Sequence, residues 1–118
     1  MDKKDFPKCK PQFLTINKLN SDDFRVRYKA LRTVSNNFIA RSDVRGYIFE
    51  YKGQKCYLCG ASGSLQIDHV ISVYEAAKRK LPYGIVNMFD NLMPICEKCN
   101  AGKRVLQGEL WRDDQNRE

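Results

Sequence analysis

The sequence predicts a small α+β domain, on three observations. Two amphipathic helical segments occupy the first half of the chain, a short stretch rich in β-branched residues follows, and two pairs of cysteines flank that stretch. The 118 residues suit a single domain, 1–118, because typical domains hold roughly 100 to 200 residues. A chain this short buries a modest core, so cross-links or a metal ion would add useful stability.

Three segments are expected within this domain. Residues 1–20 contain two prolines and no apolar periodicity, which predicts an N-terminal arm of uncertain order. Residues 21–53 are expected to form a basic helical extension. Residues 54–111 are expected to form the core that carries the chemistry.

The extension is predicted to contain two helices. Ser21 is the expected N-cap of a helix from about 22 to 38, with acidic residues in its first turn. Apolar side chains recur there at helical spacing: Phe24, Tyr28, Leu31 and Phe38. A second helix is expected to begin at Ser42 and Asp43 and to stop at Gly53.

The core is predicted to contain a strand or hairpin arm over residues 65–73, where β-branched side chains are frequent. A short helix is expected over 74–81, ended by Pro82, and the stretch from there to Asp90 is expected to be a loop.

The positive charge of the chain is concentrated in its first half. The net charge is +7, and residues 1–55 carry 13 Lys and Arg against 6 Asp and Glu, whereas residues 56–118 carry 8 of each kind. Such a segment attracts polyanions such as nucleic acid, although an ordinary solvated surface can carry the same excess. The first helix places Arg25, Arg27, Lys29 and Arg32 on its other faces, where they could meet phosphates or water.

We expect a cytoplasmic protein that does not bind a membrane. No apolar stretch approaches the roughly 18 residues of a membrane span, and the amino terminus lacks the apolar run of a signal peptide. In a reducing compartment, cysteines at short fixed spacings are more often metal ligands than disulfides.

Four of the five cysteines form two C-x-x-C pairs, Cys56 with Cys59 and Cys96 with Cys99. Two thiolates in one tight turn can reach the same ion, and two such turns complete the tetrahedral shell of structural Zn²⁺. Redox-active pairs are the alternative, but two pairs in a chain otherwise poor in cysteine favour zinc. All four thiolates are needed to close the shell, so catalysis must come from elsewhere.

The second half of the chain offers candidates for that chemistry. His69, the single histidine, has an unperturbed pKa, roughly 6.5, that suits a general base at neutral pH. Asp68 is a hard oxygen ligand of the kind that Mg²⁺ selects. Asn100 directly follows Cys99, and Lys103 lies on the same helical face, where it could meet a phosphate oxygen. Hydrolysis of a phosphodiester needs such a base and such a cation.

One geometric condition applies to the acid and the histidine. Adjacent residues of a regular strand point to opposite faces of the sheet. Asp68 and His69 can therefore serve one phosphate only if the strand ends or bulges at this point.

The order of these motifs resembles that of the HNH endonucleases with the ββα-metal fold. The chain runs from C-x-x-C through IDHV (67–70) and DNLMPIC (90–96) into CEKCNAGKR (96–104), and the likeness covers residues 45–107. The resemblance implies a metal-dependent endonuclease that hydrolyses DNA, with double-stranded DNA expected, and a homodimer or larger assembly is a possible working state.

The resemblance also implies a role for each matching residue. His69 would be the general base that activates water, and Asp68 would be a ligand of the catalytic divalent metal. Asn91 would brace the hairpin and orient His69, and Asn100 would be the second ligand of the catalytic metal. The ligands of a structural zinc would be the four paired cysteines, Cys56, Cys59, Cys96 and Cys99.

The chain departs from the family pattern at two points. Asn100 stands where many relatives have histidine, and its amide oxygen favours Mg²⁺ or Mn²⁺ over softer ions, so we expect Mg²⁺. The stretch from His69 to Asn91 is longer than in minimal members, and we assign the excess to the predicted short helix, as a further DNA contact. The candidate DNA contacts are then Arg25, Lys29, Arg32, Lys78, Arg79, Lys80, Lys103 and Arg104.

Two other functions compete with this one. A zinc-stapled nucleic-acid-binding module without catalysis would use the same basic half and the same cysteines. A zinc deaminase requires H-x-E and P-C-x-x-C. Here Ile71 takes the place of the glutamate, and Ile95 separates Pro94 from Cys96, so the deaminase signature is excluded.

Overall fold

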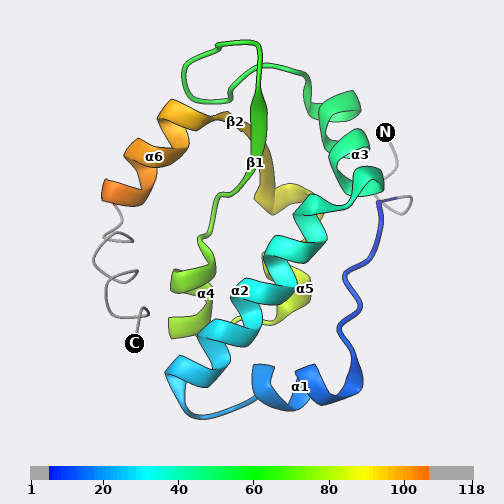
Figure 1. Cartoon of the computed structure of the whole chain (residues 1–118), viewed down its shortest axis with the longest axis vertical. Helices are drawn as coiled ribbons and strands as arrows, with labels where there is room; N and C mark the ends of the chain where they lie inside the picture. Colours follow the sequence, from blue (N-terminus) through cyan, green and yellow to red (C-terminus); the bar gives the residue numbers. More distant parts are fainter. Residues whose placement is uncertain (1–5, 107–118) are drawn as a thin grey trace.

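A two-stranded antiparallel sheet lies at the centre of the computed structural model, which describes residues 6–106, with side chains up to residue 103. The strands are β1 (Leu65–His69) and β2 (Leu92–Cys96), and helix α6 (Glu97–Leu106) follows β2 directly and packs against both strands (Figure 1). Helices from the first half of the chain cover the sheet from the other side. The predicted α+β class, with a ββα unit preceded by helices, is confirmed.

The register of the sheet is continuous from Leu65 opposite Cys96 to His69 opposite Leu92. Because every residue of β1 has one partner on β2, the strand contains no bulge, and it ends at His69. Asp68 and His69 are both paired in this regular ladder, so their side chains project to opposite faces of the sheet, and the geometric condition is not met within the strand.

The two long helices of the extension are present as α2 (Phe24–Ala40) and α3 (Ser42–Lys52). Gly53 ends α3 with φ 90, a left-handed conformation that favours glycine. The predicted N-cap of α2 is wrong by two residues, because the Asp23 carboxylate accepts the N–H of Arg25 at 2.9 Å. Ser21 lies two residues earlier, and its hydroxyl accepts the N–H of Asp23 at 3.1 Å.

The hydrophobic core consists of two clusters that share α2. One joins α2 and α3 to the sheet, and its buried members are Phe6, Phe38, Val44, Ile48, Ile67, Phe89 and Leu92. The other joins α2 to helices α4 (Val73–Lys78) and α5 (Tyr83–Val86), and its buried members are Tyr28, Leu31, Ala76, Ala77 and Val86. The sheet and the helix pair α2–α4 are thereby held as one body.

The expected N-terminal arm differs from the structure over residues 6–20. This part contains helix α1 (Phe13–Leu19), and Phe6 is 8% exposed, with its ring edge-on to Phe38 at 5.8 Å and to Phe89 at 5.5 Å between centroids. One buried aromatic residue gives no periodicity, so the sequence pattern could not reveal this contact.

Two further expectations are corrected. The expected loop before Asp90 contains α5 and is followed by a 3-10 turn, η2 (Phe89–Asn91), elements too short to produce a period. Arg27, expected on an outer face of its helix, is only 7% exposed. Its guanidinium donates to the carbonyls of Ala77 and Ser21, both at 2.8 Å, which compensates its burial. Among the helices of residues 6–106, none is both long and apolar enough to cross a membrane.

Candidate active site and metal centre

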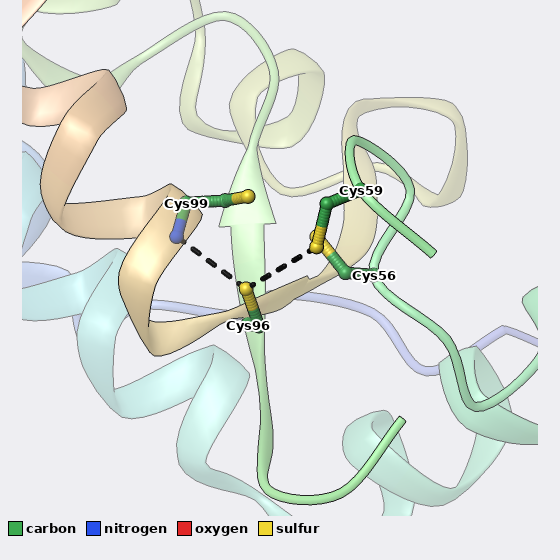
Figure 2. Close-up of side chains that lie close together, drawn as sticks. All are labelled: Cys56, Cys59, Cys96 and Cys99. Carbon is green, nitrogen blue, oxygen red and sulfur yellow. Dashed lines mark hydrogen bonds between the residues drawn. The ribbon is translucent and has the colours of Figure 1, made fainter. Parts of the chain in front are cut away.

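The four paired cysteines gather at the end of the sheet where β2 passes into α6 (Figure 2). Their sulfur atoms all lie within 4.8 Å of one another, and Sγ of Cys59 lies 3.7 Å from Sγ of Cys96. Four thiolates at roughly 2.3 Å from one zinc ion would be about 3.8 Å apart along each edge of the tetrahedron. The cluster therefore has the dimensions of a four-cysteine metal site.

Backbone contacts hold the two halves of the cluster in place. In the first half, Cys56 donates its N–H to Ala61 at 2.8 Å, and Gly60 closes the turn with φ 80. The N–H of Tyr57 donates to the carbonyl of Pro94 at 3.0 Å, which ties this turn to β2. In the second half, Cys96 ends β2 and lies one helical turn before Cys99 in α6.

The surroundings of the cluster shift the pKa values of two of its thiols in opposite directions. Burial acts to raise the pKa of Cys56, but hydrogen bonds with the backbone of Cys96 and Cys59 outweigh it and lower the pKa to about 6. The pKa of Cys99 is raised to about 12, chiefly by side-chain hydrogen bonds with Cys96 and Cys59. A divalent cation would stabilise the thiolate form at all four positions.

Asp68 lies on the face of β1 that meets α6, and its side chain is enclosed by two donors. Its Oδ2 accepts a hydrogen bond from the hydroxyl of Tyr57 at 2.6 Å and from Nζ of Lys103 at 2.5 Å. The side chains of Lys103 and Asp68 are 15% and 8% exposed, so this is a nearly buried ion pair. Burial and the bond to Asp68 raise the pKa of Tyr57, so its hydroxyl stays protonated and donates.

The ammonium group of Lys103 occupies a cage of oxygen atoms. Besides the Asp68 carboxylate, it contacts the carbonyls of His69 at 2.9 Å and Val70 at 3.4 Å. Three oxygens converge on one positive charge at the end of β1, and this place in the structure therefore suits a cation. Sequence reasoning assigned Lys103 to a phosphate, whereas here it neutralises the acid.

His69 points to the other side of the strand and is 8% exposed. Its Nε2 lies 2.8 Å from Oδ1 of Asn87, a residue at the end of α5. Burial lowers the pKa of His69, since the charged imidazolium would lose its hydration, and the ring is therefore neutral at neutral pH. Asp68 and His69 thus contact different elements although they are neighbours.

Asn91 holds the segment that follows His69. Its Oδ1 accepts the N–H of Ile71 at 2.7 Å, and its Nδ2 donates to the carbonyl of Val86 at 2.8 Å. Its backbone carbonyl accepts the N–H of Val70 at 2.9 Å. All of these contacts are to backbone, so the ring of His69 is reached by Asn87 instead.

Asn100 lies near Asp68 without contacting it. Its Nδ2 donates to Oε1 of Gln66 at 2.8 Å. Gln66 and Asp68 share one face of β1, two residues and roughly 6.6 Å apart along the strand. In this structure Asp68 pairs with Lys103, and Asn100 instead contacts Gln66, two residues before Asp68 on the same face of β1.

The family model described as HNH endonuclease matches residues 56–105. Residues 56–105, termed here the HNH domain, are similar to HNH endonucleases. The comparison bears out the resemblance seen in the sequence, and the cysteine cluster agrees with it. Comparison with curated proteins and with solved structures gave no match.

Two residues that the sequence motifs did not reveal, Tyr57 and Asn87, contact Asp68 and His69. Tyr57 sits inside the first C-x-x-C, and Asn87 lies between the family motifs, so neither belongs to a recognisable pattern. Asn87 also bonds Ser35 of α2 at 3.0 Å, and Ser35 lies outside the matched range. Their partners are remote in sequence, and only the fold shows them.

Among the described candidate DNA contacts, all but Lys103 are exposed, and the side chain of Lys103 is 15% exposed. Six of them are exposed and lie on or just after the packed helices α2 and α4: Arg25, Lys29, Arg32, Lys78, Arg79 and Lys80. Two of these form weak surface ion pairs, Arg79 with Glu75 at 3.8 Å and Lys80 with Asp22 at 3.7 Å. The side chain of Arg104 lies outside the described residues.

Proposed function

We propose that the HNH domain hydrolyses phosphodiester bonds of DNA in a reaction that depends on a divalent metal. The observation that carries the proposal is the match to the HNH endonuclease model over a segment in which Asp68 and His69 end the first strand beside α6. The reaction would take place in the cytoplasm, where reducing conditions keep the cysteines available for metal.

His69 is the general base of the proposed reaction. Its imidazole takes a proton from water, the water oxygen bonds to phosphorus, and the bond from phosphorus to the leaving oxygen breaks. The leaving oxygen receives a proton from solvent. The neutral state that burial imposes on His69 suits this role, because only the neutral ring can accept a proton.

The four cysteines are proposed to hold a structural Zn²⁺. Their sulfur separations fit the tetrahedral shell, and the shell would be complete without a position for substrate. The ion would join the turn at residues 56–59 to the junction of β2 and α6. The site residues between these two points would then depend on it for their placement.

A catalytic Mg²⁺ or Mn²⁺ is proposed to lie beside Asp68, with Asn100 as the second protein ligand. The oxygen cage around the Lys103 ammonium supports a cation at this place. A divalent cation there would neutralise charge on the phosphate and on the leaving oxygen. Asn100 would exchange Gln66 for the metal, and Lys103 would leave Asp68 and become available to a phosphate oxygen.

Double-stranded DNA is the proposed substrate, held by the exposed basic residues of α2 and α4. Six positive side chains on two packed helices give a sequence-tolerant attraction to phosphates. Each copy carries one His69 and therefore one active site. One copy acting alone would cut one strand at a time, whereas a homodimer would carry two such sites.

A second candidate function is favoured by the ion pair of Asp68 with Lys103. If the ammonium stays in place, its positive charge beside Asp68 disfavours a divalent metal there, and the domain is a zinc-stapled module that binds nucleic acid without cutting it. The two functions differ in one outcome, because only the nuclease converts supercoiled plasmid to nicked or linear DNA.

The test is incubation of the full chain with supercoiled plasmid in Mg²⁺, Mn²⁺ or EDTA. Cleavage with either metal and none with EDTA is expected, and His69→Ala should lower the rate roughly 10²- to 10⁴-fold. Asn100→Ala should lose activity that excess metal partly restores, whereas no metal concentration should rescue His69→Ala. Binding of DNA without cleavage under every condition would favour the second candidate.

A further inference from the structure

Asn87 is the one described side chain that contacts the ring of His69 through a hydrogen bond. It follows α5 and is 3% exposed. Its Oδ1 lies 2.8 Å from Nε2 of His69, and its Nδ2 lies 3.0 Å from Oγ of Ser35 and 3.2 Å from the carbonyl oxygen of Tyr83. A buried amide with partners on both of its atoms is held in one orientation.

The partners of Asn87 fix which of its atoms faces the histidine. The carbonyl of Tyr83 can only accept a hydrogen bond, so the amide nitrogen, which can only donate, must face it. The amide oxygen therefore faces His69. Because that oxygen can only accept, Nε2 of His69 must carry the hydrogen.

The other ring nitrogen follows from this assignment. A neutral imidazole has one protonated nitrogen, so Nδ1 of His69 carries the lone pair. Within residues 6–103, Nδ1 has no hydrogen-bond partner. It is thus the nitrogen available to accept a proton.

We propose that Asn87 is the positioning residue that fixes the tautomer of His69 with hydrogen on Nε2 and the lone pair on Nδ1. The inference rests on the proposed function for its catalytic meaning, since the proton of the attacking water would go to Nδ1. With the opposite tautomer, Nδ1 would be a donor and could not take it. Through Ser35, this control of the ring reaches α2, outside the HNH domain.

Asn87 differs in this from Asn91, the asparagine expected from the family pattern. Asn91 bonds only backbone groups and shapes the segment after the strand. Asn87 bonds the ring itself and so selects its protonation pattern. The two asparagines therefore divide the placement of His69, one holding the backbone and the other the imidazole.

The single histidine of the chain makes the tautomer directly measurable. Nitrogen NMR of the full chain labelled at histidine, recorded at neutral pH without DNA, assigns the hydrogen to one ring nitrogen. Hydrogen on Nε2, in a resonance protected from exchange with solvent, is the expected result. Hydrogen on Nδ1 would overturn the proposal, and this measurement needs no variant.

The second test uses the variant Asn87→Leu. Its matched control is Asn36→Leu, a separate variant at an exposed asparagine of this protein. In Asn87→Leu the protected N–H resonance should be lost and the turnover number for plasmid cleavage should fall roughly 10²-fold, with DNA affinity unchanged. An unchanged resonance and rate in this variant would contradict the proposal. Absence of cleavage in the wild type would remove the proposed function, while the NMR result would still decide the tautomer.

Discussion

The hydroxyl of Tyr57 donates a hydrogen bond of 2.6 Å to Oδ2 of Asp68, and so joins the cysteine turn directly to the acid at the end of β1. The same tyrosine donates its backbone N–H to Pro94 of β2. One residue thus contacts both strands from within the cysteine cluster, and the position of the acid depends on the position of the turn.

In the variant Tyr57→Phe, the carboxylate of Asp68 should be held less firmly. The change removes one hydrogen bond to a carboxylate, which should lower the free energy of unfolding by roughly 1.5 kcal/mol. Urea unfolding of the metal-loaded chain measures the loss, and Tyr51→Phe, whose ring is 47% exposed, is the matched control. Equal unfolding curves for the two variants would show that this bond contributes nothing.

Lys103→Met should leave the Asp68 charge nearly buried and unpaired. Without added Mg²⁺, the free energy of unfolding should fall by roughly 3 kcal/mol, as expected when one partner of a buried pair is removed. Added Mg²⁺ should recover part of this loss, because the acid then gains another positive partner. Thermal unfolding with and without Mg²⁺ measures both effects, with the exposed Lys98→Met as control. A variant as stable as wild type would mean that the pair is not formed in solution.

Cys96→Ser should abolish metal binding and folding together, since the binding of a structural metal is coupled to folding. Elemental analysis of the purified wild type should give one zinc per chain, and circular dichroism should report unfolding of the variant. Cys9→Ser is the matched control, because Cys9 is remote from the cluster and only partly buried. Wild-type protein free of zinc after gentle purification would refute the assignment.

The stability of the protein should depend on the protonation of His69. Burial lowers the pKa of His69 in the folded state, so the unfolded chain binds a proton that the folded chain does not. The contribution of neutral His69 to the free energy of unfolding is complete above the unfolded pKa, roughly 6.5. This contribution is lost as the pH falls toward the folded pKa, by at most about 1.4 kcal/mol per pH unit. Urea unfolding at pH 7.5, 6.5 and 5.5 should show a steeper loss for wild type than for His69→Gln. Parallel losses would exclude this linkage.

The basic residues of α2 should fall into two groups, one that binds DNA and one that stabilises the fold. Replacing Arg25, Lys29 and Arg32 by glutamine should weaken DNA binding and lower its salt slope by roughly 0.9 for each phosphate that is no longer neutralised. Arg27→Gln should instead lower the free energy of unfolding, because two buried carbonyls lose their donor. Binding measured from low to high salt, with unfolding curves for each variant, distinguishes the two kinds. An unchanged slope in the triple variant would mean that these charges are merely solvated.

The sequence predicted the parts of the fold that repeat or cluster locally. Periodic apolar residues predicted α2 and α3, and paired cysteines at short spacing predicted the cysteine cluster. The short helices α1 and α5, of 7 and 4 residues, complete at most two turns, so their patterns are indistinguishable from loops. Their existence is decided by packing against α2.

The site was predictable only as far as its motif extends. Asp68, His69 and Asn91 belong to recognisable strings, whereas Asn87 meets Ser35 across 52 positions of sequence, a pairing that no local pattern encodes. The contact of Lys103 with Asp68, 35 positions apart, was missed for the same reason. Side-chain partners at such separations are set by how α6 packs on the sheet and α5 on α2.

The core cluster around the sheet sets a limit on how the HNH domain can be transplanted. Phe38, Val44 and Ile48 cover the sheet but precede the HNH domain, as does Phe6. A graft of residues 56–105 into a foreign host would carry the cysteines and the histidine, yet it would leave an apolar face open to water. The smallest portable unit therefore reaches back to Phe6, and recombination that moved the HNH domain between genes would have to move the preceding helices with it.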